Sequence, residues 1–221
     1  MTLLERFLDP SFVSLKICGL TREAEACQLV ALGIDALGVN FWPESKRFLD
    51  PENATWLRSL AGKILRVGVF VNAPAELPMR LHAAGLLDVI QLHGDETPAD
   101  AEGFHAVKIP VIKAIGVKSS DELSHAADYG AIAMLLDAHA PGVYGGTGRS
   151  FDWNVAAEFR KLHPNLPIIL AGGIVPDNAA LAARTVRPAA LDVASGAEVA
   201  PGIKDFSKIE ALQRALASLT D

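Results

Sequence analysis

Two side chains that can exchange protons, Cys18 and Asp137, each follow a short apolar run. A thiol can act as a base near neutral pH when a nearby cation lowers its pKa, and Lys16 lies on the same side of a strand as Cys18. A carboxyl group at the rim of an apolar site tends to keep its proton, so Asp137 can serve as a general acid. The two residues therefore form a complementary base and acid pair. The structural alternatives are a small buried hydrophobe for Cys18 and a helix cap or loop ion pair for Asp137. Cys27, in contrast, is expected to be a buried structural cysteine.

Two pairs of small residues follow the last two apolar runs: Gly172-Gly173 and, within Ala194-Ser195-Gly196, the pair Ser195-Gly196. Glycine lets a backbone approach phosphate oxygens closely, and a helix start supplies oriented N–H donors. Glycines can also simply turn tight loops. Two such pairs on adjacent strands favour a phosphate ligand.

Other polar candidates lie in neighbouring loops. Arg47 follows the second apolar run, where a guanidinium can bind a carboxylate with two hydrogen bonds, although a solvated loop charge is the simpler interpretation. His93 is either a hydrogen-bonding site residue or a capped histidine at the rim. The glycine-rich segment 141–148 predicts a mobile lid or an ordinary flexible connection. We find no His/Asp/Glu set with metal-ligand spacing.

Strands rich in Val, Ile and Leu must position these residues. Most of the apolar runs are four to eight residues long and lack polar alternation, which is typical of parallel strands buried on both faces. The runs are 15–17, 36–41, 64–71, 86–92, 111–115, 131–136, 168–171 and 189–193. Helix-start signals separate them, namely Thr21 as an N-cap, Asp50 before Pro51, residues 119–122, Asp152 before Trp153, and 176–178, with a last helix over 206–219.

Eight strand–helix repeats predict a single (β/α)8 TIM barrel, in which working residues lie at the carboxyl ends of strands. We expect a lead segment at 1–13, as an extra helical turn or a loose arm, and the catalytic barrel at 14–221. An open doubly wound sheet is the alternative, but its glycine fingerprint should follow the first strand, where the sequence has Cys18-Gly19-Leu20-Thr21.

Composition excludes several classes of protein. Half of the 221 residues are hydrophobic, and 20 basic against 26 acidic residues give a net charge of −6. Disorder, binding to bulk nucleic acid and a membrane span of about 20 apolar residues are all disfavoured. Two cysteines cannot form a disulfide framework, so we expect a cytoplasmic protein. The sequence leaves the oligomeric state open between a monomer and a homodimer.

The order of several motifs resembles the phosphoribosylanthranilate isomerase family from about residue 15 to the C-terminus. The motifs are Lys16-Ile17-Cys18-Gly19-Leu20-Thr21, Gly38 to Phe41, Ser45 to Arg47, Val67 to Asn72, Gln91 to Gly94, Leu136-Asp137, Tyr144 to Gly148, Phe151 to Trp153, Leu170 to Ile174, Asp192 to Gly196 and Pro201 to Asp205. Small departures are Lys46 where proline is frequent, Ala194 where serine is common and Ala197 where valine is common.

The resemblance implies an Amadori rearrangement of N-(5-phospho-β-D-ribosyl)anthranilate in tryptophan biosynthesis, without a cofactor. It implies that Asp137 opens the ribose ring as general acid and that Cys18 removes the C2′ proton as general base. It also implies that Arg47 holds the anthranilate carboxylate and that the amides around Gly172-Gly173 and Ala194-Ser195-Gly196 hold the phosphate. Asp192 and His93 match as substrate contacts. Because the net charge is negative, we expect an anionic substrate to depend on Arg47, Lys16 and loop amides.

Rival functions remain on the same barrel. A sugar-phosphate isomerase of histidine biosynthesis would need aspartate in place of Cys18, and a pentose-phosphate epimerase would need metal ligands. A non-catalytic phosphate-binding barrel need not keep both Cys18 and Asp137.

Overall fold

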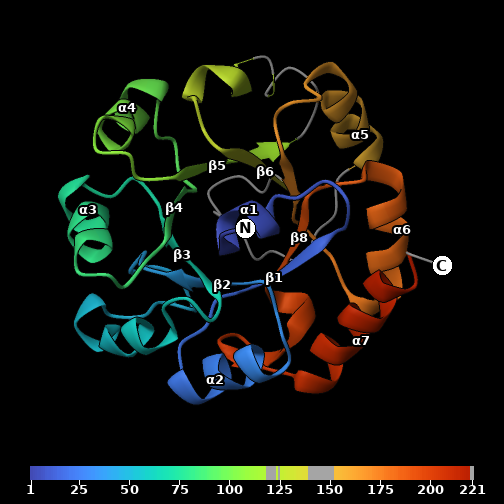
Figure 1. Cartoon of the computed structure of the whole chain (residues 1–221), viewed down its shortest axis with the longest axis horizontal. Coiled ribbons are helices and arrows are strands. Elements are labelled where there is room, and N and C mark those ends of the chain that lie inside the picture. Colours follow the sequence, from blue (N-terminus) through green and yellow to red (C-terminus); the bar gives the residue numbers. More distant parts are fainter. Residues whose placement is uncertain (118–122, 124, 139–151, 220–221) are drawn as a thin grey trace.

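Eight parallel strands close into a barrel in the computed structural model, which describes residues 1–117, 123, 125–138 and 152–219 (Figure 1). Neighbouring strands follow the chain order, and the last strand pairs with the first, with Lys16 beside Asp192. The strands are β1 (Ser14–Cys18), β2 (Ala36–Asn40), β3 (Leu65–Phe70), β4 (Val89–Leu92), β5 (Val111–Val117), β6 (Ala133–Ala138), β7 (Ile168–Leu170) and β8 (Ala190–Val193). Each predicted apolar run overlaps one of them, with β1, β5 and β6 extending beyond their runs. The closed barrel rules out the open doubly wound sheet.

Helices surround the barrel as an outer layer (Figure 1). They are α2 (Glu23–Ala31), α3 (Glu76–Ala83), α4 (Pro98–Ala106), α5 (Trp153–Leu162), α6 (Pro176–Val186) and α7 (Phe206–Ala217), with the 3-10 helices η1 (Pro51–Asn53), η2 (Thr55–Leu60) and η4 (Ala126–Tyr129). After β8 come η5 (Ser195–Ala197) and a hairpin of β9 (Glu198–Ala200) and β10 (Ile203–Lys204). None of the helices in the described ranges is long and apolar enough to cross a membrane.

Most helix-start signals are confirmed, and three local predictions need correction. Asp50 caps the turn at Pro51, but that turn is a 3-10 helix rather than an α-helix. Thr21 is not an N-cap, because its hydroxyl donates to the carbonyl of Gly202 and α2 begins after Arg22. Cys27 is exposed rather than buried, since α2 turns its buried face through Glu25, Ala26 and Leu29. The start predicted at 119–122 and the glycine-rich segment 141–148 lie outside the described residues.

The N-terminal end of the barrel is covered by the short helix α1 (Leu3–Phe7), which lies over the centre of the ring in Figure 1. Thr2 and Glu5 form a capping box that fixes its first turn. Phe7 is fully buried and packs among residues at the beginnings of the strands, including Ala36, Leu65 and Val89. A second cluster of apolar side chains fills the space between barrel and helices. The barrel is therefore a packed body with an apolar floor, which leaves its carboxyl end for chemistry.

Candidate active site

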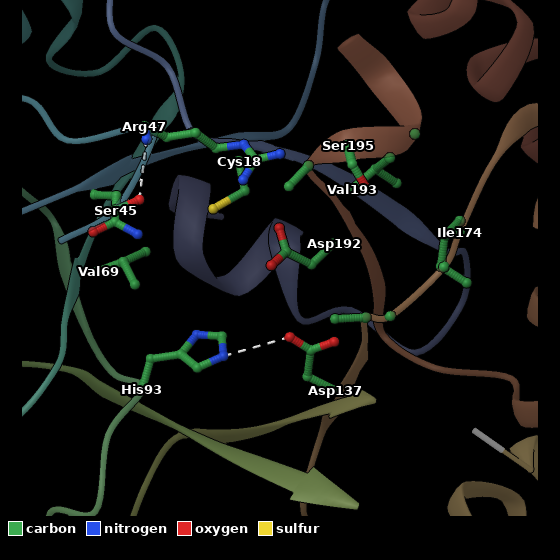
Figure 2. A pocket seen from close by; sticks show the side chains of 17 residues that line it. Cys18, Ser45, Arg47, Val69, His93, Asp137, Ile174, Asp192, Val193 and Ser195 are labelled. Atoms are coloured by element: carbon green, nitrogen blue, oxygen red, sulfur yellow. Dashed lines mark hydrogen bonds and ion pairs between the residues drawn. The ribbon is translucent and has the colours of Figure 1, made fainter. Parts of the chain in front are cut away.

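One pocket at the carboxyl ends of the strands brings together every site residue that the sequence predicts. These are Cys18, Arg47, His93, Asp137, Gly172, Gly173, Asp192, Ala194, Ser195 and Gly196. Figure 2 shows the labelled ones converging from opposite sides of the barrel. Residues at the ends of β1, β6 and β8 and directly after β4 meet here because parallel strands of a closed barrel all end at the same rim.

Cys18, the last residue of β1, pairs in register with Gly38 on β2. A side chain at position 38 would crowd it, because an added Cβ would stand 2.6 Å from the Cys18 sulfur. Burial raises the pKa of the thiol; Lys16 and Lys204 lower it, Asp192 raises it, and the net pKa lies above the ordinary value. The expected lowering of this pKa is thus not found, because desolvation outweighs the two cations.

Beneath Cys18, a buried ion pair joins β1 to β8. Lys16 is fully buried, and its Nζ donates to Asp192 at 2.8 Å and to Gln91 Oε1 at 3.1 Å. Burial alone would lower the pKa of Lys16, but the charges of Asp192 and Cys18 outweigh it and raise the pKa above its usual value. Lys16 is therefore a cation in the floor of the site that the protein itself neutralises, rather than one free for a ligand.

Through Gln91, Lys16 also determines which nitrogen of His93 carries the proton that faces Asp137. Because Lys16 can only donate, it binds the oxygen of the Gln91 amide, which turns the amide nitrogen toward His93 Nδ1 at 2.8 Å. His93 Nδ1 then accepts, so the ring proton lies on Nε2, 3.5 Å from Asp137 Oδ2. Figure 2 shows the imidazole and this carboxylate facing each other. Of the two roles left open for His93, the structure favours the hydrogen-bonding one.

A second part of the pocket is made of backbone. Gly172 and Gly173 have φ of 83° and 66°, which other residues rarely adopt. Gly196 lies within the short helix η5, which begins at Ser195, and a Cβ at position 196 would collide with the carbonyl oxygen of Ile174. In the part of the chain that the structure describes, the N–H groups of Gly172, Gly173, Ser195 and Gly196 have no acceptor. Such a group of donors fits an anion such as a phosphate.

Arg47 reaches the pocket but is not free of partners. Its Nε and Nη2 donate to Glu198 at 2.9 and 2.7 Å, so Glu198 takes one edge of the guanidinium. Glu198 also accepts from Lys204 Nζ at 2.7 Å. Sequence reasoning missed both Glu198 and its role beside Lys204. Arg47 and Lys16, on which an anionic substrate is expected to depend, are each already paired with a carboxylate of the protein. The available signal for Lys204 was the motif Pro201 to Asp205, and for Glu198 its position between Gly196 and that motif.

The described residues contain no group of three or more His, Cys, Asp or Glu side chains placed to hold a metal ion. What the pocket does contain is an acid and a thiol on opposite strands, a group of backbone donors and an arginine at the edge. These features define a (β/α)8 barrel built to bind a phosphorylated, anionic small molecule and to move protons on it.

Comparison with known proteins agrees with this class. The sequence model of the family described as N-(5'phosphoribosyl)anthranilate (PRA) isomerase matches residues 15–215. The N-(5'-phosphoribosyl)anthranilate isomerase of Pseudomonas putida (strain GB-1) is 44% identical over 210 residues, covering 93% of this chain and 98% of that protein. The chain belongs to the PRA isomerase family.

Solved structures give the same result. Phosphoribosyl anthranilate isomerase from Thermus thermophilus is 41% identical with a TM-score of 0.82, over 94% of this chain and all (100%) of that one. A phosphoribosyl anthranilate isomerase in complex with reduced 1-(o-carboxyphenylamino)-1-deoxyribulose 5-phosphate is 34% identical with a TM-score of 0.81, over 93% and 99% of the two chains.

Proposed function

We propose that the protein catalyses the Amadori rearrangement of N-(5-phospho-β-D-ribosyl)anthranilate to 1-(2-carboxyphenylamino)-1-deoxy-D-ribulose 5-phosphate, a step of tryptophan biosynthesis. The observation that carries the proposal is the placement of Cys18 and Asp137 on β1 and β6, across one pocket. The loops after β7 and β8 line the same pocket with backbone N–H groups that have no acceptor among the described residues. Family membership supports the same reaction.

Asp137 acts as the general acid in this proposal. Its proton passes to the ribose ring oxygen, the C1′–O bond breaks, and the nitrogen lone pair forms a Schiff base at C1′. The carboxyl group is suited to this role because it is buried at the end of β6. His93, whose Nε2–H faces Asp137 Oδ2, holds the carboxyl group in place and stabilises the charge that remains after proton transfer.

Cys18 acts as the general base. Its thiolate takes the C2′ proton, the electron pair of the C–H bond forms the C1′–C2′ double bond, and the pair of the C1′–N double bond returns to nitrogen. The resulting enolamine tautomerises to the ketone. Burial raises the pKa of the thiol above its ordinary value. Lys16 and Lys204 are the groups that stabilise the thiolate when it forms. Protons alone are moved, so the scheme needs no redox cofactor.

The substrate carries two anionic groups, and the pocket has a place for each. The amides around Gly172-Gly173 and Ala194-Ser195-Gly196 hold the phosphate, and Arg47 faces the anthranilate carboxylate. Asp192 is a further contact to the sugar in this proposal, although its Oδ1 already accepts a hydrogen bond from Lys16. In this proposal the partner is a phosphorylated small molecule rather than a nucleic acid or a membrane, and we expect the enzyme to work in the cytoplasm.

The direct test follows the loss of phosphoribosylanthranilate fluorescence with purified protein and asks whether the gene restores growth without tryptophan to an isomerase-deficient strain. We expect both to succeed, and Cys18→Ser to lower the rate of fluorescence loss by at least about 100-fold. Full activity in the presence of a chelator separates this reaction from a metal-dependent epimerase. Failure to consume the substrate, with an intact fold, would reject the proposal.

A further inference from the structure

We propose that Glu198 is a positioning residue that makes Arg47 selective for the aromatic carboxylate of the substrate. The inference rests on the proposed function and adds a group that does not itself touch the substrate. It starts from the fact that Arg47, which is to bind the carboxylate of the substrate, already binds the carboxylate of Glu198.

The geometry of the Arg47–Glu198 pair carries the argument. A guanidinium has two edges that can bind a carboxylate through two parallel N–H groups: the side edge, formed by Nε and Nη2, and the end edge, formed by Nη1 and Nη2. Glu198 accepts from Nε and Nη2, so it occupies the side edge. Within the described ranges, Nη1 has no acceptor, and Arg47 lines the pocket. The end edge is thus left for a second carboxylate.

Glu198 is itself held rigidly. It is buried, and its Oε1 accepts from Lys204 Nζ at 2.7 Å and from the backbone of Gly202 at 3.1 Å. Oε1 also accepts from Arg47 Nε, so one carboxylate oxygen joins Arg47 to the β9–β10 hairpin, in which Lys204 pairs in register with Glu198. These contacts restrain the carboxylate, and through it the orientation of the guanidinium plane.

Two further contacts tie this unit to the reacting end of the site. The Arg47 side chain passes over Gly19, where an added Cβ would collide with its Cδ. Lys204 Nζ also donates to the backbone carbonyl of Cys18. A single buried carboxylate therefore sets the position of the carboxylate-binding edge relative to the strand end that carries the base.

The charge balance explains why the residue is an acid. Without Glu198, Arg47 and Lys204 would be two neighbouring cations with no counter-charge, and the guanidinium would be free to meet any anion, the substrate phosphate included. With Glu198, only the end edge remains, and its two parallel donors match a planar carboxylate.

The test compares two stable probes that differ by one group. The first is reduced 1-(o-carboxyphenylamino)-1-deoxyribulose 5-phosphate, and the second is the same compound without the carboxyl group. Dissociation constants are measured by calorimetry for the wild type and for Glu198→Gln, whose amide would turn N–H groups toward Arg47. We expect the variant to bind the carboxylated probe about tenfold or more weakly, in line with the loss of charged hydrogen bonds, and to bind the second probe unchanged.

A matched control is available at the opposite end of the barrel. Asp88 binds the side edge of Arg66 in the same way, through Nε at 3.0 Å and Nη2 at 2.6 Å. Asp88→Asn removes an equivalent ion pair far from the pocket. We therefore expect the Asp88→Asn variant to bind both probes with the dissociation constants of the wild type. The preference for the carboxylated probe should fall in the Glu198 variant alone.

Three results would decide against the inference or its basis. Equal weakening of both probes by Glu198→Gln would show a merely structural residue, and unchanged binding of both would show no role. A wild type that binds neither probe would reject the proposed function instead. If Glu198→Gln does not fold, Glu198→Asp is the second variant. It keeps the charge but shortens the side chain by one methylene, so we expect a smaller loss of affinity, again for the carboxylated probe alone.

Discussion

Two arginines with the same kind of partner lie at opposite ends of the barrel. Arg66, near the start of β3, is bound side-on by Asp88, and Arg47, in the loop after β2, is bound side-on by Glu198. The difference is in the remaining donor. Nη1 of Arg66 donates to the carbonyls of Leu57 and Gly85 at 3.1 and 2.7 Å, whereas Nη1 of Arg47 has no acceptor in the described structure.

This contrast separates a structural arginine from one that waits for a ligand. A buried donor without an acceptor costs free energy, so the fold satisfies every edge of an arginine whose task is to hold loops together. An edge left open beside a pocket is tolerated because water or substrate can fill it. The same distinction applies to the two ends of the barrel. Phe7 closes the N-terminal end, whereas the carboxyl end has backbone donors without an acceptor among the described residues.

The largest expected effects concern the chemistry of the mouth. We expect Cys18→Ser and Asp137→Asn each to lower turnover by at least about 100-fold, because each removes an acid or base from the reaction. Thermal unfolding should stay close to the wild type. Steady-state kinetics and calorimetry of the same samples measure both. Near wild-type turnover in either variant would remove that residue from the proposed mechanism.

Substitutions at the N-terminal end of the barrel should affect stability rather than turnover. Phe7→Ala removes a fully buried ring, so we expect the free energy of unfolding to fall by about 3 kcal/mol while turnover is unchanged. Denaturant unfolding measures the first and kinetics the second. Leu181→Ala, at a side chain that is 61% exposed, is the control and should change neither. A loss of turnover at a temperature where the Phe7 variant is still folded would contradict the assignment of stability to the N-terminal end and of chemistry to the carboxyl end.

The two arginines should separate in one paired experiment. We expect Arg47→Met to raise KM about tenfold or more, since it loses a charged contact to the substrate, with a smaller change in turnover. Arg66→Met should lower the free energy of unfolding by about 2 kcal/mol and leave KM unchanged. If both variants altered stability alone, the open edge of Arg47 would have no functional meaning.

The smallest effect is a pH dependence of stability at Glu198. Burial would raise the pKa of this carboxyl, but hydrogen bonds from Arg47 and the charge of Lys204 outweigh it, so the pKa lies below the ordinary 4.5. A lowered pKa in the folded state means that ionised Glu198 stabilises the fold above 4.5 and that this stabilisation is lost as the pH falls through the lower value. Melting temperatures of wild type and Glu198→Gln should therefore differ at neutral pH and converge in acid. A constant difference would contradict the assignment.

Much of the fold could be predicted from the sequence, because its signals are local. A strand buried on both faces must be apolar along its whole length, so the runs that became β1 to β8 could be recognised without knowing their neighbours. The residues at the ends of those runs, such as Cys18 and Asp137, then had to meet, since a closed parallel barrel has one carboxyl end. Family resemblance added roles to these positions, which remain predictions for each side chain.

What the sequence could not determine is which charges pair across the barrel. Arg47 and Glu198 are separated by 151 positions, and nothing local in either segment indicates that the second occupies one edge of the first. The raised pKa of Cys18 likewise depends on how deeply closure buries the thiol beside Lys16 and Asp192. Strand patterns are set by neighbours along the chain, whereas pairing and desolvation are set by neighbours in space. For that reason the sequence determined where the site lies, and only the tertiary structure decided how its charges are balanced.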